Sequence, residues 1–151
     1  MISDKIILKR ASTVDEPLVQ SLFERSPSYF KKVDGSDVLH HFAKKEMQDK
    51  PKSCLPTYEK VFLLAFLKDK LFGVVDLHKD HPIIGTAYIG LLLVDDEFQE
   101  KGIGRSLYFA TEKYAINNLN ITRFLLGVSE LNEVTGFWEK VGFSNNGKSY
   151  I

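Results

Sequence analysis

Residues 91–105 read Leu91-Leu92-Leu93-Val94-Asp95-Asp96-Glu97-Phe98-Gln99-Glu100-Lys101-Gly102-Ile103-Gly104-Arg105, and this stretch decides the fold. The apolar run 88–94 predicts a strand, because it is too short for a core helix, and its interior Gly90 suggests a bulge. After a polar turn, apolar residues step by four, three and four, which predicts the buried face of a helix at Ile103, Leu107, Ala110 and Tyr114. A buried strand therefore leads through a glycine-containing turn into a helix that ends near Asn117 and Asn118.

The segments on either side predict a mixed sheet. Apolar runs at 61–67 and 71–77, separated by Lys68, Asp69 and Lys70, are typical of an antiparallel hairpin of buried strands, with a loop at 78–85 after it. Further strands are expected at 6–8, 123–128 and from Phe143 onward, and further helices at 13–25, 38–48 and 134–141. The first of these helices has a Thr13-x-x-Glu16 capping pattern. The order indicates an α+β fold in α/β/α layers, with a mixed, mostly antiparallel central sheet and about four helices.

Composition excludes several classes of protein. The chain has 151 residues, 44% hydrophobic and 26% charged, which favours one folded domain over residues 1–151 and argues against a disordered or fibrous chain. Twenty basic and twenty acidic residues cancel, so no overall field attracts nucleic acid or an anionic membrane. The apolar runs are far shorter than the roughly 20 residues that span a bilayer, and the first ten residues lack a secretory apolar core. The single Cys54 suits a reducing compartment, so the cytoplasm is expected.

The glycines at the start of the 103–118 helix predict an anion site. Amide N–H groups in the first turn of a helix have no internal partner and carry the positive end of the helix dipole. Gly102 and Gly104 leave space in front of them, and Lys101 and Arg105 add local positive charge. By itself the pattern Q-x-x-G-x-G is weak, since it arises by chance in about a few per cent of such chains. It gains specificity from a second segment, Phe137-Trp138-Glu139-Lys140-Val141-Gly142-Phe143, about thirty-five residues further on.

These two segments resemble the GNAT (Gcn5-related N-acetyltransferase) family. Gln99, Gly102 and Gly104 are similar to its Q/R-x-x-G-x-G/A acetyl-CoA motif, and Asn132 with residues 137–143 is similar to its C-terminal N...F-[YW]-E-K-x-G-F segment. The order of elements from Ile6 to Phe143 also matches that of the family, with its acyl-CoA N-acyltransferase fold. Residues 27–30 and 34–35 resemble the start of a bacterial subgroup.

The resemblance implies acetyl-CoA as co-substrate, with direct transfer of its acetyl group to a primary amine of a small molecule, peptide or protein. It implies a pyrophosphate site made chiefly by backbone amides, a strand that pairs with the pantetheine arm, and a second wall of the cleft. The cofactor-binding residues that follow are Leu92, Leu93 and Val94 for the strand, Gln99, Glu100, Lys101, Gly102, Ile103, Gly104, Arg105 and Ser106 for the pyrophosphate, and Asn132, Phe137 and Trp138 for the second wall.

The chain departs from the family pattern at three places. Trp138 stands where many members carry a tyrosine proposed to protonate the departing thiolate, and an indole N–H cannot serve as that acid. The interval from Asn132 to Phe137 is one residue shorter than usual. Only eight residues follow Phe143, too few for the hairpin that normally closes the sheet, so a homodimer partner is expected to cover the edge.

The catalytic residues stay open at the level of sequence. Asp76 and Glu130 each follow an apolar strand, and a carboxylate buried beside a cleft would favour base chemistry, although carboxylates at strand ends are more often solvated. His78 and His81 have H-x-x-H spacing but no third ligand nearby, so a turn is favoured over a metal site and no metal is expected.

The favoured interpretation is an acyl-CoA-dependent N-acetyltransferase, with its acceptor pocket shaped by residues 26–60. The alternative is a non-catalytic acyl-CoA-binding or sensor module, which would bind the cofactor without turnover. A generic nucleotide-binding protein is a third hypothesis, and for it ATP would compete with coenzyme A.

Overall fold

A computed structural model describes residues 5–26, 42–98, 102–126 and 142–143. Five strands form one sheet in the order β1-β2-β3-β4-β5. In chain order the elements are β1 Ile7–Arg10, the 3-10 helix η2 Thr13–Asp15, α1 Glu16–Glu24, α3 Phe42–Gln48, β2 Glu59–Leu67, β3 Lys70–Lys79, β4 Thr86–Val94, the 3-10 helix η3 Asp96–Phe98, α4 Ile103–Asn118 and β5 Arg123–Leu126.

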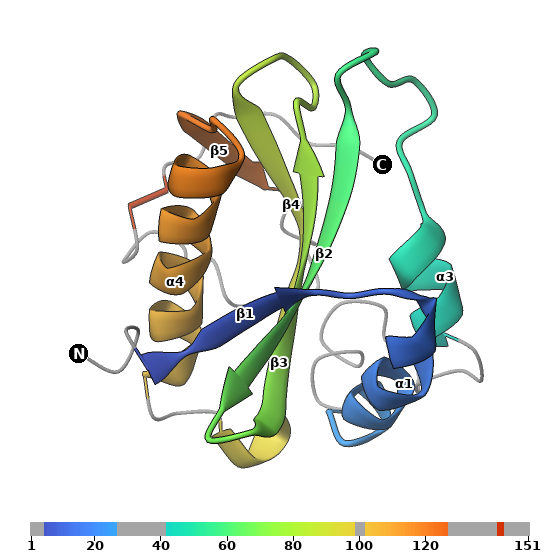
Figure 1. The fold of residues 1–151 in the computed structure, drawn as a ribbon, viewed down its shortest axis with the longest axis vertical. Coiled ribbons are helices and arrows are strands. Elements are labelled where there is room, and N and C mark those ends of the chain that lie inside the picture. Colours follow the sequence, from blue (N-terminus) through green and yellow to red (C-terminus); the bar gives the residue numbers. More distant parts are fainter. Residues whose placement is uncertain (1–4, 27–41, 99–101, 127–141, 144–151) are drawn as a thin grey trace.

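The sheet is mixed, as the sequence predicts. The strand pairs β1–β2, β2–β3 and β3–β4 are antiparallel, whereas β4 and β5 are parallel because α4 carries the chain back between them. In Figure 1, α4 covers one face of the sheet, and α1 and α3 cover the other. The expected α+β fold in α/β/α layers, with a mostly antiparallel central sheet, is therefore confirmed for the described part of the chain.

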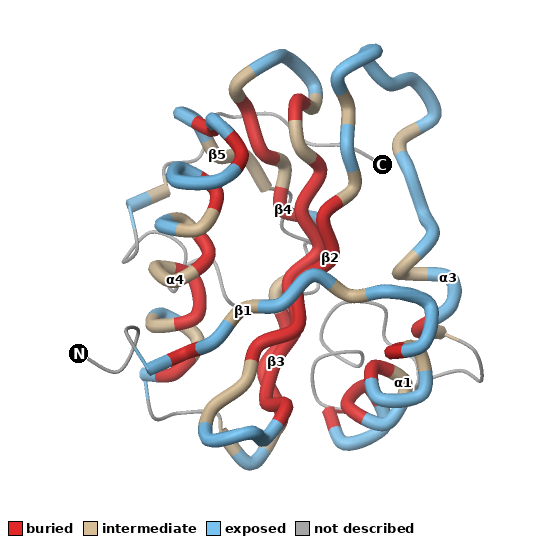
Figure 2. The backbone as a smooth tube through the Cα atoms, in the orientation of Figure 1, coloured by how far each residue is buried: buried red, intermediate tan, exposed pale blue. Residues whose placement is uncertain are grey.

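Alternation along β2 and β3 divides the core into two halves. Val61, Leu63 and Ala65 pack with Leu107 and the rest of the core on the α4 side. Phe62 and Leu64, which alternate with them, pack against Val19, Leu22, Phe23 and Ala43 from α1 and α3. Since both faces of the central strands are covered, these strands are continuously apolar, and Figure 2 shows them as the buried centre of the molecule.

The hairpin between β2 and β3 closes with a two-residue turn. Lys68 and Asp69 both have positive φ, at 48° and 65°, as a type I′ turn requires. The turn matches the predicted position, and both strands are longer than the apolar runs indicate. In particular, β3 continues through Lys79, so His78 belongs to the strand and not to the predicted 78–85 loop.

One further detail differs from the sequence predictions, one lies outside the described residues, and one agrees. The capping pair of the first helical segment is Ser12 and Asp15, since the Ser12 N–H donates to Asp15 Oδ2 at 2.9 Å, one residue before the predicted Thr13 and Glu16. The described part of the second helix begins at Phe42, and the predicted start at Val38 lies outside the described residues. In β4, the register shifts so that Asp76 pairs with Leu91 and Leu77 with Ile89, which confirms the predicted bulge at Gly90.

Candidate functional site

The chain passes from the C-terminal end of β4 through η3 and residues 99–102 to the start of α4. Gly102 precedes the helix in the left-handed conformation, with φ 70° and ψ 9°, which a residue with a side chain adopts only under strain. A Cβ added to Gly102 would meet no atom within 4 Å, so the space beside this glycine is open. The first intrahelical amide bond at this end runs from Ser106 N–H to Gly102 O at 3.2 Å.

The first turn of α4 therefore presents backbone donors and positive charge to the open space. Amides of the first helical turn lack an intrahelical acceptor, and the helix dipole adds positive potential to them. Arg105 is exposed, and its guanidinium carbon lies 5.6 Å from the centre of the Phe109 ring. The Ser106 hydroxyl donates to Gly102 O at 3.2 Å and keeps its lone pairs for another donor. This arrangement can bind a phosphate or diphosphate.

The backbone of β4 distinguishes Leu93 from Leu92. Asp95 N–H donates to Phe72 O of β3 at 2.8 Å, and a Cβ added to Gly73 of β3 would lie 2.8 Å from Leu93 O. Asp95 and Leu93 thus direct their backbone groups toward β3. Because successive strand residues point to opposite edges, Leu92 directs its N–H and C=O toward the β5 side. The described pairs of β4 with β5 end at Ile89 and Leu126, before Leu92 is reached.

Several of the predicted site residues lie outside the described residues. They are Gln99, Glu100, Lys101, Glu130, Asn132, Phe137 and Trp138. Of the predicted cofactor-binding set, the structure places Leu92, Leu93 and Val94 on β4, and Gly102, Ile103, Gly104, Arg105 and Ser106 at the start of α4. These two groups adjoin the same end of β4.

A second polar cluster surrounds Asp76 on the α1 and α3 side of the sheet. Asp76 is only 2% exposed, and its Oδ2 lies 3.2 Å from Lys60 Nζ and 3.3 Å from His78 Nε2. These residues are cross-strand neighbours or alternate along one strand, since Lys60 of β2 pairs with His78 of β3. Lys60 Nζ also donates to the backbone oxygen of Asp49. The sequence leaves open whether Asp76 is a solvated or a catalytic carboxylate. In the structure Asp76 is buried and paired with Lys60.

Tyr58 and His78 extend this cluster toward the N-terminal end of β2. Tyr58 Oη and His78 Nδ1 are 2.7 Å apart, and the two rings stack with centroids separated by 5.9 Å. Burial, followed by the negative charge of Asp76, raises the pKa of Tyr58 to about 12. Tyr58 consequently keeps its proton at neutral pH.

Glu46 of α3 faces the same cluster. Burial and the nearby negative charge of Asp76 raise the pKa of Glu46 to about 7, with Lys60 and Lys45 opposing and Asp49 adding to the shift. A carboxyl with such a pKa exchanges its proton near neutral pH. Glu46 is thus the titratable neighbour of Asp76 on the covering helix.

From sequence, His78 is considered only as a metal ligand, whereas Tyr58, Lys60 and Glu46 fall within the residues 26–60 that are expected to shape the acceptor pocket. No role in a cluster with Asp76 is predicted for any of them. A signal was available for His78, because Asp76 and His78 are two residues apart and share a strand face if the period-2 pattern is continued beyond Leu77. The predicted absence of a metal site stays a prediction. Among the described residues, no group of three or more His, Cys, Asp or Glu side chains is arranged to hold an ion.

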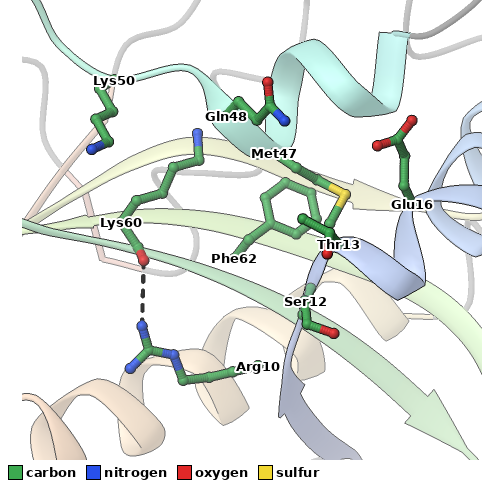
Figure 3. Close-up of a pocket in the computed structure, with 10 residues that line it drawn as sticks. Arg10, Ser12, Thr13, Glu16, Met47, Gln48, Lys50, Lys60 and Phe62 are labelled. Carbon is green, nitrogen blue, oxygen red and sulfur yellow. Dashed lines mark hydrogen bonds between the residues drawn. The ribbon is translucent and has the colours of Figure 1, made fainter.

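A pocket of about 440 Å³ lies beside this cluster, between the start of α1, the end of α3 and β2. Figure 3 shows Phe62 at its floor beneath Met47, with the amino groups of Lys60 and Lys50 on one side. Its lining is Arg10, Ala11, Ser12, Thr13, Glu16, Met47, Gln48, Lys50, Lys60 and Phe62. The volume is in the range of small-molecule sites, and Lys60 joins the pocket to Asp76.

Comparison with solved structures shows what this fold is similar to. An acetyltransferase from Thermus thermophilus has a TM-score of 0.73 and 23% identity, over 93% of this chain and 87% of that one. Spermidine N-acetyltransferase from Vibrio cholerae, in complex with CoA and spermine, has a TM-score of 0.69 and 18% identity, over 95% and 83%. A ribosomal-protein-alanine N-acetyltransferase from Brucella melitensis biovar Abortus 2308 has a TM-score of 0.67 and 17% identity, over 97% of each chain.

Comparison at the level of sequence identifies the family. A search of curated proteins found no match to the sequence. The model of the acetyltransferase (GNAT) domain matches residues 30–151, which include β2 to β5 and the start of α4. This match extends over most of the chain and agrees with the fold. The chain belongs to the GNAT acetyltransferase family.

Proposed function

We propose that this protein is an acetyl-CoA-dependent N-acetyltransferase that moves the acetyl group directly to a primary amine of a small molecule, peptide or protein. The observation that carries the proposal is the entrance to α4, where the left-handed Gly102 leaves open space beside the amides of the first turn. A diphosphate fits this arrangement, because the ligand's two charges meet backbone donors, the helix dipole and Arg105. Family membership supports coenzyme A as the source of that diphosphate.

In this proposal β4 aligns the rest of the cofactor. Leu92 turns its backbone groups toward the β5 side, so a pantetheine arm that runs along this edge from the start of α4 can pair with it like a strand. The arm then leads from the diphosphate toward the bulge at Gly90. Lys101 and Gln99 would complete the phosphate loop, and Asn132, Phe137 and Trp138 the opposite wall.

The acceptor must reach the thioester as a neutral amine. An alkylamine with a pKa near 10.4 is neutral in only about one part in 2,500 at pH 7, so a proton acceptor at the site raises the reactive fraction. Asp76 and Glu130 remain the proposed candidates for this role. Asp76 lies next to the bulge of β4, since it pairs with Leu91 across the ladder.

The exposed thiol of Cys54 supports a reducing compartment as the place where the protein works. Cys54 is exposed, and its Sγ lies 3.4 Å from the backbone oxygen of Pro51, so the thiol is accessible to oxidants. We propose a cytoplasmic, bacterial enzyme in which residues 1–151 form one domain. Among the described helices, none has the length and apolar character needed to cross a membrane. A homodimer stays a prediction, which sedimentation at several protein concentrations would test.

The test is a thiol-release assay with acetyl-CoA and a panel of amines, followed by mass spectrometry of the amines. The panel contains a polyamine, an aminoglycoside and a peptide with an N-terminal alanine, so that it spans different primary amines. We expect amine-dependent release of coenzyme A together with an amine heavier by one acetyl group. Tight binding of coenzyme A with no release across the panel would favour the non-catalytic sensor, and competition by ATP would favour a nucleotide site.

A further inference from the structure

One oxygen of the Asp76 carboxylate is held by the protein, and the other is not. Oδ2 accepts a hydrogen bond from Lys60 Nζ at 3.2 Å and lies 3.3 Å from His78 Nε2. Oδ1 is buried and has no hydrogen-bond partner among the described residues. Since a buried carboxylate oxygen without a donor is unfavourable, a donor that arrives with a ligand would stabilise this site.

At the bulge of β4, the backbone of Gly90 packs closely against His78 and this carboxylate. A Cβ added to Gly90 would lie 2.9 Å from His78 Nε2 and 3.1 Å from Asp76 Oδ2, so any side chain here would press on both groups. Gly90 itself is exposed. Only glycine fits at this position without a shift of its neighbours, and Gly90 is thus an exposed residue of β4 that lies directly against the cluster.

The Tyr58 hydroxyl contacts His78 Nδ1 at 2.7 Å and limits the orientation of its ring. In the inferred arrangement Tyr58, which keeps its proton, donates this hydrogen bond to Nδ1. The proton of the neutral imidazole is then on Nε2, which faces Asp76 Oδ2. Lys60 and His78 together turn the carboxylate so that the lone pairs of Oδ1 stay open to a further donor.

We infer that Asp76 Oδ1 receives the acceptor as its primary ammonium ion beside the bulge of β4 and takes one proton from it, and that His78 and Tyr58 are positioning residues for this carboxylate. The inference rests on the proposed acetyl transfer and assigns the proton acceptor of that reaction. The ligand class is a primary alkylammonium, which brings both the positive charge and the donor that the buried oxygen lacks.

The proton balance of the step is as follows. One N–H bond of the ammonium breaks as the O–H bond of Asp76 forms, and the lone pair left on nitrogen attacks the thioester carbon. When the C–S bond of the tetrahedral intermediate breaks, the electron pair leaves on sulfur, and a second proton from nitrogen ends on the thiolate. Asp76 later returns its proton to solvent. Amine, acetyl-CoA and a proton acceptor account for every atom and charge.

The charged groups that face Asp76 come from three elements. Lys60 of β2 and His78 of β3 contact Oδ2, and Glu46 of α3 adds a carboxyl whose pKa is close to neutrality. One fixed cation therefore faces one to two negative charges, depending on pH. When Glu46 is ionised, an ammonium ion balances the second negative charge, whereas a further anion would add to the repulsion.

The first arm of the test compares Asp76→Asn with the wild-type enzyme. The substitution keeps the size of the side chain and removes the basic oxygen, so we expect kcat to fall by about 100-fold or more, with an increase in KM for the amine. Calorimetry with coenzyme A should give an unchanged Kd, which also shows that the variant is folded. Turnover by the wild type with unchanged kcat in the variant would overturn the inference and leave the proposed function standing. No turnover by the wild type across the panel would overturn both.

The second arm tests the positioning residues and decides the matter if Asp76→Asn does not fold. Tyr58→Phe should lower kcat by about tenfold, the effect of one hydrogen bond, and long-range proton–nitrogen NMR should show loss of the single Nε2–H tautomer of His78. The matched control is Tyr108→Phe, which removes a buried hydroxyl that donates to Glu112 at 2.8 Å on the other face of the sheet. A wild-type His78 protonated on Nδ1, or equal kcat values for both phenylalanine variants, would contradict the assignment.

Discussion

At the scale of single residues, burial decides the chemistry of the polar side chains. Glu46 and Tyr58 are ordinary residues in the sequence, yet their surroundings raise the pKa of the first to about 7 and of the second to about 12. Burial, followed by the hydrogen bond to Glu112, likewise raises the pKa of Tyr108, so its hydroxyl stays protonated. Tyr108 is 3% exposed and packs in the core.

Glu46 makes stability depend on pH. The folded protein holds the proton of Glu46 more tightly than the unfolded chain does, because the pKa rises from 4.5 to about 7. The favourable contribution is complete below about pH 4.5 and is lost as the pH rises to about 7, and its size is at most about 3 kcal/mol. Glu46→Gln should therefore flatten the change in the free energy of unfolding between pH 5 and pH 8, measured with urea. An identical pH dependence in both proteins would contradict the shift.

A side chain at position 90 should affect catalysis without affecting cofactor binding. In Gly90→Ala the new methyl group would press on His78 Nε2 and Asp76 Oδ2, at 2.9 and 3.1 Å. We expect kcat/KM for the amine to fall roughly 10- to 100-fold, since small displacements of reacting groups are costly. The Kd of coenzyme A should stay the same in calorimetry. Unchanged steady-state kinetics would show that the placement of His78 and Asp76 does not matter for the reaction.

At the scale of elements, the turn between β2 and β3 is not optimised for its conformation. Lys68 and Asp69 occupy positive φ values that asparagine and glycine adopt more easily. The double substitution Lys68→Asn and Asp69→Gly should raise the free energy of unfolding by about 1 kcal/mol, measured by denaturant titration. The same pair of residues introduced at exposed Lys44 and Lys45 of α3 should lower it, because glycine weakens a helix. A loss of stability from the turn substitution would argue against the type I′ geometry.

The elements were largely predictable from sequence, and the errors have local causes. The hairpin, α4 and the bulge at Gly90 follow from apolar runs, helical spacing and an interior glycine, which are signals carried by adjacent residues. The predicted cap lies one residue too late, because Ser12 and Asp15 compete with Thr13 and Glu16 for the same role. The predicted strand ends too early, at Leu77, because His78 is a polar residue on a buried face of β3.

At the scale of the whole molecule, α1 is tied to the end of β4 by one buried carboxylate. Asp95 is fully buried, and its Oδ2 accepts from Arg25 Nε at 2.9 Å, while its Oδ1 accepts from Glu97 N–H at 3.0 Å. Arg25 also lies 3.5 Å from the backbone oxygen of Leu71. These contacts bridge 70 residues of sequence and brace the strand that leads to the start of α4.

Removing the charge of Asp95 should therefore destabilise the fold. Asp95→Asn keeps the shape but weakens the ion pair, and we expect a loss of about 2 kcal/mol, less than for a fully buried pair because Arg25 is partly exposed. The matched control is Glu97→Gln, whose partner Lys70 is 3.0 Å away and exposed. That exposed pair should contribute no more than about 0.5 kcal/mol. Equal losses for the two variants in urea unfolding would contradict this difference.

The complete polar cluster around Asp76 could not be predicted from the sequence, because its residues are brought together only by the fold of the whole molecule. Tyr58 and Lys60 come from the start of β2, Asp76 and His78 from the end of β3, and Glu46 from α3. Only the register of the sheet and the packing of α3 bring them together. By contrast, the start of α4 is built from consecutive residues, so its glycines and Arg105 could be predicted as a group.

The most direct test of the central claim is the Kd of coenzyme A, measured by calorimetry for the wild type, Arg105→Glu and Lys113→Glu. Both variants reverse one exposed charge on α4, but only Arg105 lies in the first turn. The account predicts binding by the wild type, at least about tenfold weaker binding by Arg105→Glu, and an unchanged Kd for Lys113→Glu. No binding by the wild type, or the same Kd for all three proteins, would contradict a diphosphate site at the start of α4.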